Sequence, residues 1–277
     1  MKKWLTALLG GAAALAMSFP AFAAEDPAAV LDRVSAKADT LDSMDSRVGM
    51  HIVLLPDEQD VQSGLRMDMD MTMKMDGVVT GDLRYLTEAA VSTLGVTAYS
   101  VSFYEDGYVY TDTDGLKLKY PMDLEAVMES ASGMDFASEP ESSYMKNITL
   151  SEINGVRVLG YEMDTAQMNA LMGEIMGSLA GTQVIPGASA EMAADISFRE
   201  IRGSYILTDD DYYSYANMYM VYDMKLMDQD LTCIILMEMN VNNPGQEITL
   251  TLPSTEGYQE LAGYYDAMLA DLDVEEQ

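Results

Sequence analysis

Methionine occupies every second position of one short stretch, and most of the positions between are charged. The methionines are Met67, Met69, Met71, Met73 and Met75. Successive side chains of a β-strand point to opposite faces, whereas a helix would spread these five residues around its axis. The pattern therefore predicts a strand with one face of thioethers and one face in water.

A second run of the same character lies near the end of the chain. Between residues 213 and 227, alternate positions hold Met218, Met220, Tyr222 and Met224. Each run belongs to a block of strands and turns that is followed by a helical pattern. This weak internal similarity predicts either two similar halves, at about 28–132 and 147–272, or one continuous sheet built from two similar blocks.

The remaining pattern predicts an antiparallel α+β protein. Apolar residues at helical spacing predict helices at 27–41, after Asp123, from Thr165 and from Tyr258. Asp-Gly and Asn-Gly pairs are strong hairpin signals, and 228–230 reads as a turn. The expected strands are 46–55, 65–76, 81–88, 96–104, 108–110, 116–120, 148–153, 156–163, 196–207, 213–227 and 232–241.

The first residues are typical of an export leader. Two lysines precede an apolar run, and Ala21-Phe22-Ala23 offers a small-x-small cleavage pattern. We expect residues 1–24 to be a signal peptide and 25–277 to be a single exported domain. No cysteine lies near the cleavage position, so we expect no lipobox anchor, and no later segment predicts an integral membrane span.

The chain is strongly acidic. Its formal charge is -31, or -33 once the two leader lysines are removed. Phosphate binding needs a basic surface, so this charge excludes nucleic acid as an expected partner. The acids alternate with apolar residues, which indicates solvated faces of secondary structure rather than an acidic tail.

Few residues offer catalytic or metal-binding chemistry. His51 is the one histidine and Cys233 the one cysteine, and both stand inside predicted strands. A zinc site or a nucleophilic triad needs more of these residues close together. We therefore expect no catalytic residue, no metal and no cofactor, although scattered acids leave a secreted hydrolase as the weakest alternative.

The methionine faces are the candidate binding residues. Methionine is flexible and polarizable, and it adapts to irregular gaps and to varied partners. The faces are then either ordinary core or the wall of an adaptable apolar cavity, and a Cu(I) array is a third, weaker reading. The candidate ligand-binding residues are Met67, Met69, Met71, Met73, Met75, Met218, Met220, Tyr222 and Met224.

The order of elements resembles the LolA/LppX-like superfamily of bacterial cell-envelope proteins. It is most similar to an uncharacterised family of exported proteins and lipoproteins from Gram-positive bacteria. The segments that carry the likeness are 104–110 (YEDGYVY), 119–124 (KYPMDL), 243–248 (NPGQEI) and Leu252-Pro253. The resemblance implies a large curved antiparallel sheet, a half-barrel, with helices packed on its concave face.

The resemblance also implies a function. The concave side of that fold holds acyl chains or lipoproteins, so we expect an exported, non-enzymatic binding protein of the cell envelope. Its expected partners are a lipid or a lipidated peptide, and in addition an envelope protein. The alternative is a closed structural, sensor or protein-interaction module with no small ligand.

Overall fold

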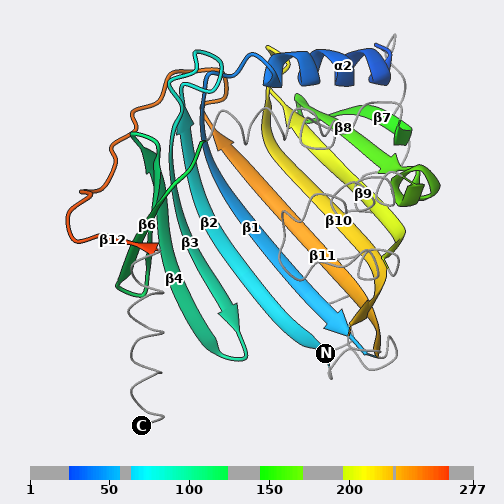
Figure 1. Ribbon diagram of the computed structural model, residues 1–277. Helices are drawn as coiled ribbons and strands as arrows, with labels where there is room; N and C mark the ends of the chain where they lie inside the picture. The colour runs from blue at the N-terminus through cyan, green and yellow to red at the C-terminus, as the bar shows by residue number, and fades with distance from the viewer. Residues whose placement is uncertain (1–24, 57–63, 124–143, 171–195, 227–228, 262–277) are drawn as a thin grey trace.

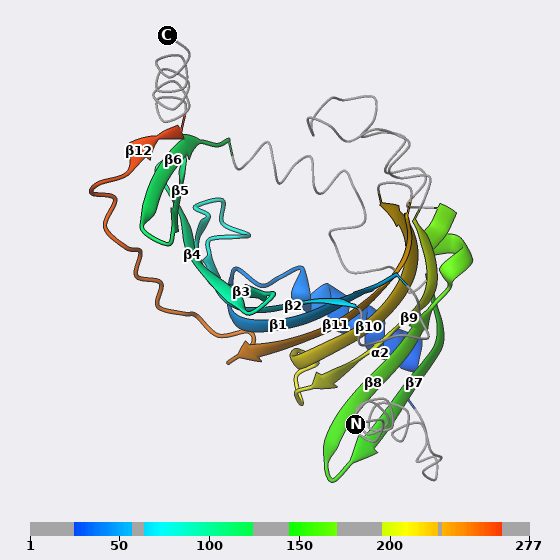
Figure 2. The same cartoon turned by 90° about the horizontal axis from the view of Figure 1, so that it is seen from below.

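One continuous sheet dominates the molecule. The computed structural model describes residues 25–56, 64–123, 144–170, 196–226 and 229–261. Within these ranges, twelve strands form a single sheet that curves into an open half-barrel (Figures 1 and 2). The predicted fold class is confirmed. The predicted leader and the helix expected after Asp123 lie outside the described residues.

The strands follow the chain in two blocks. They are β1 (Ser43–Leu55), β2 (Leu65–Asp76), β3 (Arg84–Thr93), β4 (Val96–Glu105), β5 (Tyr108–Thr113), β6 (Leu116–Pro121), β7 (Met145–Ile153), β8 (Val156–Met163), β9 (Ser197–Leu207), β10 (Tyr213–Leu226), β11 (Gln229–Asn242) and β12 (Gln259–Glu260). Their order in the sheet is β12-β6-β5-β4-β3-β2-β1-β11-β10-β9-β8-β7. The two blocks meet where β1 pairs with β11.

Three local predictions need correction. The strand expected at 81–88 is β3, which starts at Arg84 and continues to Thr93. The turn expected at 228–230 overlaps β11, in which Asp230 pairs with Lys225. Tyr258 is not part of the expected final helix: it precedes β12, which pairs in parallel with β6. Leu261 is helical, and the rest of that helix lies outside the described residues. A ring contact places Tyr258 against Phe103 and Tyr110, and this contact is long-range, so local periodicity did not reveal it.

That contact also identifies the two faces of the sheet. Figure 2 shows the chain after β11 running along the outer, convex side before it reaches β12. Tyr258 lies on this path, and its ring centroid is 5.8 Å from that of Phe103. The register places Phe103, Leu86 and Lys74 in one row, so the face that carries Lys74 and Asp70 is the convex one. The methionines of β2 therefore face the concave side.

Helix α2 (Pro27–Ala38) packs on the concave side at one end of the sheet. The side chain of Asp26 caps it by accepting a hydrogen bond from the amide of Ala28 at 3.2 Å. Its buried residues are Val30, Leu31 and Val34, and they share a core cluster with side chains of β7, β8 and β9. Residues 165–170 are also helical, as predicted, and contribute Met168 to the same cluster.

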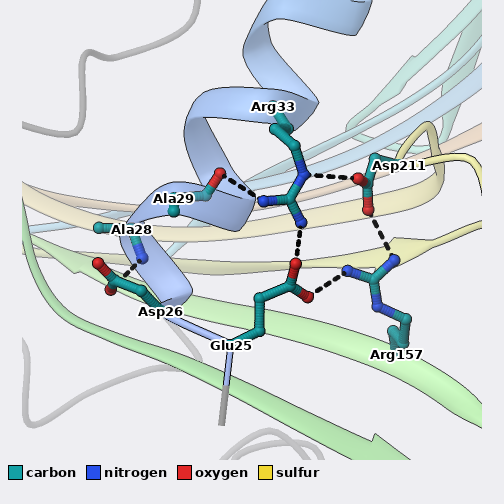
Figure 3. A network of polar contacts seen from close by, with 7 residues as sticks. All are labelled: Glu25, Asp26, Ala28, Ala29, Arg33, Arg157 and Asp211. Carbon is teal, nitrogen blue, oxygen red and sulfur yellow. Dashed lines mark hydrogen bonds and ion pairs between the residues drawn. The ribbon is translucent and has the colours of Figure 1, made fainter.

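A ring of alternating charges holds α2 to the sheet (Figure 3). Arg33 donates to Asp211 at 2.8 Å and also pairs with Glu25. Arg157 of β8 donates to Asp211 at 2.6 Å and reaches Glu25 at 3.3 Å. The four side chains therefore connect the start of the helix, strand β8 and the turn after β9.

No helix in the described part of the chain is long and apolar enough to cross a membrane.

Replacing Asp211 by Asn tests the charge ring. Burial alone would raise the pKa of Asp211, but the hydrogen bonds and charges of Arg33 and Arg157 lower it overall. A lowered pKa stabilises the fold above the unfolded value of about 4, and this gain is lost as the pH falls through the folded value. Asn tolerates the positive φ of 63° at this position.

We expect D211N to lower the free energy of unfolding by roughly 1 kcal/mol at neutral pH. Urea unfolding at several pH values measures this. The difference from the wild type should shrink as the pH falls below about 4. A constant difference at every pH would mean that the ring of charges does not stabilise the fold.

Leu94 occupies a turn position whose positive φ is unfavourable for leucine. Four two-residue turns have a non-glycine residue followed by glycine, both with positive φ; the other three use Asp106, Asp114 and Asn154 at the first position. Leu94 has φ 50° and is 84% exposed. A bulky residue in this conformation costs about 1–2 kcal/mol, whereas Asn and Asp can adopt it routinely.

Replacing Leu94 by Asn should therefore raise the free energy of unfolding by roughly 1 kcal/mol, since Asn-Gly is a preferred hairpin turn. Thermal and urea unfolding measure the change. Asn154→Leu, in the β7–β8 turn, is the matched reverse substitution and should lower stability by a similar amount. A destabilised Leu94→Asn variant would contradict this account of the turn.

Candidate functional site

The pairing register assembles the methionines of separate strands into rows on the concave face. Met218 of β10 pairs with Met237 of β11, Met237 with Met50 of β1, and Met50 with Met69 of β2. Four methionines thus stand side by side across four neighbouring strands. At a strand spacing of about 4.8 Å, this row is about 15 Å long.

Every sequence-predicted site residue lies on this concave face. The register places Met67, Met69, Met71, Met73, Met75, Met218, Met220, Tyr222 and Met224 together there. All nine are half-buried. The two runs, about 150 residues apart in the sequence, are brought to one surface because β1 and β11 join the two blocks.

Three methionines that continue these rows between the two predicted runs were not among the predicted site residues, and Met44, paired with Met75, is a fourth on the same face. The three between the runs are Met50, Met237 and Met239, and all are half-buried. The alternation of residues 233–241 was visible in the sequence, but the pairing of β1 with β11 was not. We call the twelve residues, the nine predicted ones and these three, the methionine face.

The central strands segregate charge completely between their two faces. In β10, β11, β1 and β2, no residue on the concave face is charged. Their acids and bases all point to the convex side, where Arg47 pairs with Asp70 and His51 with Asp68. The methionine face is therefore an uncharged surface in a strongly acidic protein.

The concave face is filled at one end by the protein itself. The core cluster there contains Leu159, Met163, Ile201 and the apolar side of α2. Met218, Met220 and Tyr222 touch the edge of this cluster, whereas the methionines of β2 do not belong to it. The surface thus passes from a packed core at β7–β9 to half-buried thioethers at β1 and β2.

Tyr222 lies at this boundary and is held there by packing. Its ring stands 5.7 Å from that of Phe198 in an edge-to-face contact. Burial raises the pKa of Tyr222, and a hydrogen bond to Cys233 raises it further, so the phenol stays neutral. Burial also raises the pKa of Cys233, so its thiol stays protonated in the core.

One polar atom of the concave face has no partner. The side chain of Ser46 is fully buried between Val241 and Met73, and its hydroxyl oxygen makes no hydrogen bond. A buried hydroxyl without a partner typically costs about 1–3 kcal/mol. It is the one such side chain among the described residues of the four central strands.

The described ranges contain no group of three or more His, Cys, Asp or Glu side chains placed to hold a metal ion. A hollow of about 450 Å³ does exist, but it lies on the opposite, polar face, around Gly49. The hollow and the side chains of the methionine face thus lie on opposite faces of the sheet.

Comparisons with known proteins show likenesses to several solved structures. LprF from Mycobacterium bovis is 12% identical, with a TM-score of 0.44, over 82% of this chain and 97% of that one. The lipoprotein LppX from Mycobacterium tuberculosis is 8% identical, with a TM-score of 0.37, over 81% and 98%. A DUF1329 family protein from Desulfovibrio piger is 11% identical, with a TM-score of 0.24, over 82% and 96%.

All three TM-scores are below 0.5, so no functional statement about this chain follows from these likenesses. A search of curated proteins finds no match. A family model matches residues 26–243, which include every strand of the methionine face. The chain therefore belongs to a family of unknown function, DUF6612.

Proposed function

We propose that this protein is an exported, non-enzymatic binding protein of the bacterial cell envelope that holds a lipid or a lipidated peptide against the methionine face. Residues 25–277 act as one domain in this proposal. The observation that carries it is the row of Met218, Met237, Met50 and Met69, which crosses four strands without a charged neighbour on the same face.

The chemistry of this surface suits an acyl chain. Each buried methylene contributes about 0.8 kcal/mol, so a chain laid along the row gains several kcal/mol from leaving water. Thioether side chains can rearrange around chains of different length or branching. The half-buried state of these methionines means that part of each thioether remains available for contact.

The charged convex face of the sheet is also consistent with a binding protein. Charged groups cover the convex side and keep the molecule soluble, while an uncharged inner face is reserved for an apolar partner. The alternative is a closed sensor or interaction module, in which the methionine face is ordinary core. The filled cluster at β7–β9 favours that alternative for one end of the sheet only.

Native mass spectrometry of the mature protein from its own host tests the proposal. A binding protein should carry an additional mass that organic extraction releases as an acyl lipid or a lipidated peptide. If the protein emerges without a bound mass and takes up no added fatty acid or phospholipid, the proposal is wrong and the closed module is the better account.

Substitutions of Met69 and Met237 test the surface itself. Replacing either methionine by Gln, a polar side chain of similar length, should weaken capture of a fluorescent acyl probe about fivefold. This corresponds to about 1 kcal/mol for half of a buried methionine's contribution. The double variant should lose roughly 20-fold or more.

Met69→Leu and Met237→Leu are the matched controls, because they keep the surface apolar at nearly constant volume. They should change stability by less than about 1.5 kcal/mol and retain most of the capture. Equal capture by the Gln and Leu variants would show that the probe binds somewhere other than the methionine face.

A further inference from the structure

Gly49 stands in the middle of β1, where glycine has no structural reason to be. The strand is 13 residues long, and Gly49 pairs with Glu238 on one side and Asp70 on the other. Glycine in the interior of a strand weakens it. A glycine is explained when its backbone needs positive φ or when a side chain would collide with neighbours, and neither condition holds for Gly49.

The comparison with Gly203, in β9, makes this clear. A Cβ atom built on Gly203 would lie 2.4 Å from the carbonyl oxygen of Asn217, so that position requires glycine. A Cβ atom built on Gly49 meets nothing within 4 Å, and Gly49 is not among the residues with positive φ. Its missing side chain instead leaves open space on the convex face.

That space is the floor of the hollow of about 450 Å³. Ala90 is a second small residue of the lining, and the register places it in the same row as Gly49, with Asp70 between them. Larger side chains at these two positions would fill the hollow. Glycine in a strand often marks a place where another molecule approaches the backbone closely.

Basic and acidic side chains surround the floor of the hollow. Arg47 donates to Asp70 at 3.0 Å, and His51 contacts Asp68 at 2.6 Å. The guanidinium of Arg47 and the ring of His51 are therefore both engaged with carboxylates. Ser92 and Asn240 add a hydroxyl and an amide, and Met69, whose side chain belongs to the methionine face, also borders the hollow.

Glu238 is the carboxylate left without a cation. It receives one hydrogen bond, from the hydroxyl of Tyr215 at 3.1 Å, and no ion pair within the described residues reaches it. The hollow therefore carries an excess negative charge on a protein whose net charge is already -31. A metal ion does not fit, since the described residues contain no cluster placed to ligate one.

We propose that this hollow binds an organic cation, a primary ammonium group carried on a small polar molecule or on a lysine side chain. The ammonium pairs with Glu238, and neighbouring hydroxyl or amide groups of the ligand bond to Asn240 and Ser92. Because Gly49 has no side chain, the ligand can reach the backbone at the bottom of the hollow. The polar lining of this site lies on the other side of the sheet from the methionine face, and the two share only the strand position of Met69.

We expect the ammonium ligand to bind weakly, because the hollow is open to solvent. Exposed ion pairs are weak, so we expect a dissociation constant in the millimolar range or above. A strongly acidic protein also attracts cations everywhere on its surface. The test must therefore resolve individual residues and must separate the hollow from the rest of the surface.

Backbone amide NMR of residues 25–277, titrated with two amines, meets this need. Nα-acetyl-lysine N-methylamide represents a peptide lysine, and glucosamine represents a free amine. Their neutral counterparts, the norleucine derivative and N-acetylglucosamine, are the controls. The amides of Gly49, Asp70, Ala90 and Glu238 should shift and saturate with at least one amine and with neither counterpart. The responding amine identifies the source of the ammonium.

Gly49→Val is the decisive variant. It fills the hollow with a side chain that strands favour and that meets no neighbour, so the melting temperature should stay equal or rise. The saturable shifts should nevertheless disappear. Glu238→Gln should weaken binding roughly two- to fivefold. Glu88→Gln, which removes a carboxylate from the same face outside the hollow, should have no effect.

Three results would overturn the proposal: shifts spread evenly over the acidic surface, saturable shifts that persist in Gly49→Val, or equal effects of Glu238→Gln and Glu88→Gln. None of these depends on whether the methionine face captures lipid. The two proposals therefore fail separately, since an acyl probe reports on the concave side and the amine titration on the convex side.

Discussion

The pairing of β1 with β11 is the constraint on which the rest of the structure depends. It joins two blocks of strands from opposite ends of the chain into one sheet, and its register aligns Met50 with Met237. A slip of one residue in any central strand would exchange its two faces. In β2, that slip would bring Asp68, Asp70 and Lys74 to the concave side and expose the methionines to water.

The two faces of the sheet therefore have different tasks. The convex face carries the charges, a segment that ends in Tyr258, and the hollow at Gly49. The concave face is uncharged along its whole central part, and at the β7–β9 end α2 covers it. The charge ring around Asp211 links the helix to β8 and to the turn after β9 at that end.

Much of this arrangement was predictable because it depends on short-range patterns. Strict alternation identified β2 and β10 and the face on which their methionines lie, and Asp-Gly and Asn-Gly pairs identified three hairpins. Both strands of the β3–β4 hairpin were predicted, but its turn at Leu94-Gly95 was not, because this pair is an unfavourable turn sequence. Met50 and Met237 were not assigned to the site because their contact requires the pairing of strands that are almost 200 residues apart.

Gly49 illustrates a second kind of limit. A glycine in a strand pattern can mean a bulge, a steric requirement or open space, and the sequence is the same in each case. Coordinates of the neighbouring strands distinguish these meanings, as the contrast with Gly203 shows. The fold class and the face of each candidate residue thus follow from local physics, whereas cavities follow from how distant strands are placed.

The central claim is that the methionine face receives an apolar ligand instead of serving only as core. Methyl NMR of protein labelled at the methionine ε-carbons, with a spin-labelled fatty acid added, tests this directly. If the face receives an apolar ligand, the signals of Met50, Met69, Met218 and Met237 should broaden selectively, while that of Met163 in the packed cluster should be unaffected. Equal, weak broadening of all methionine signals would show that the face is closed and would contradict the claim.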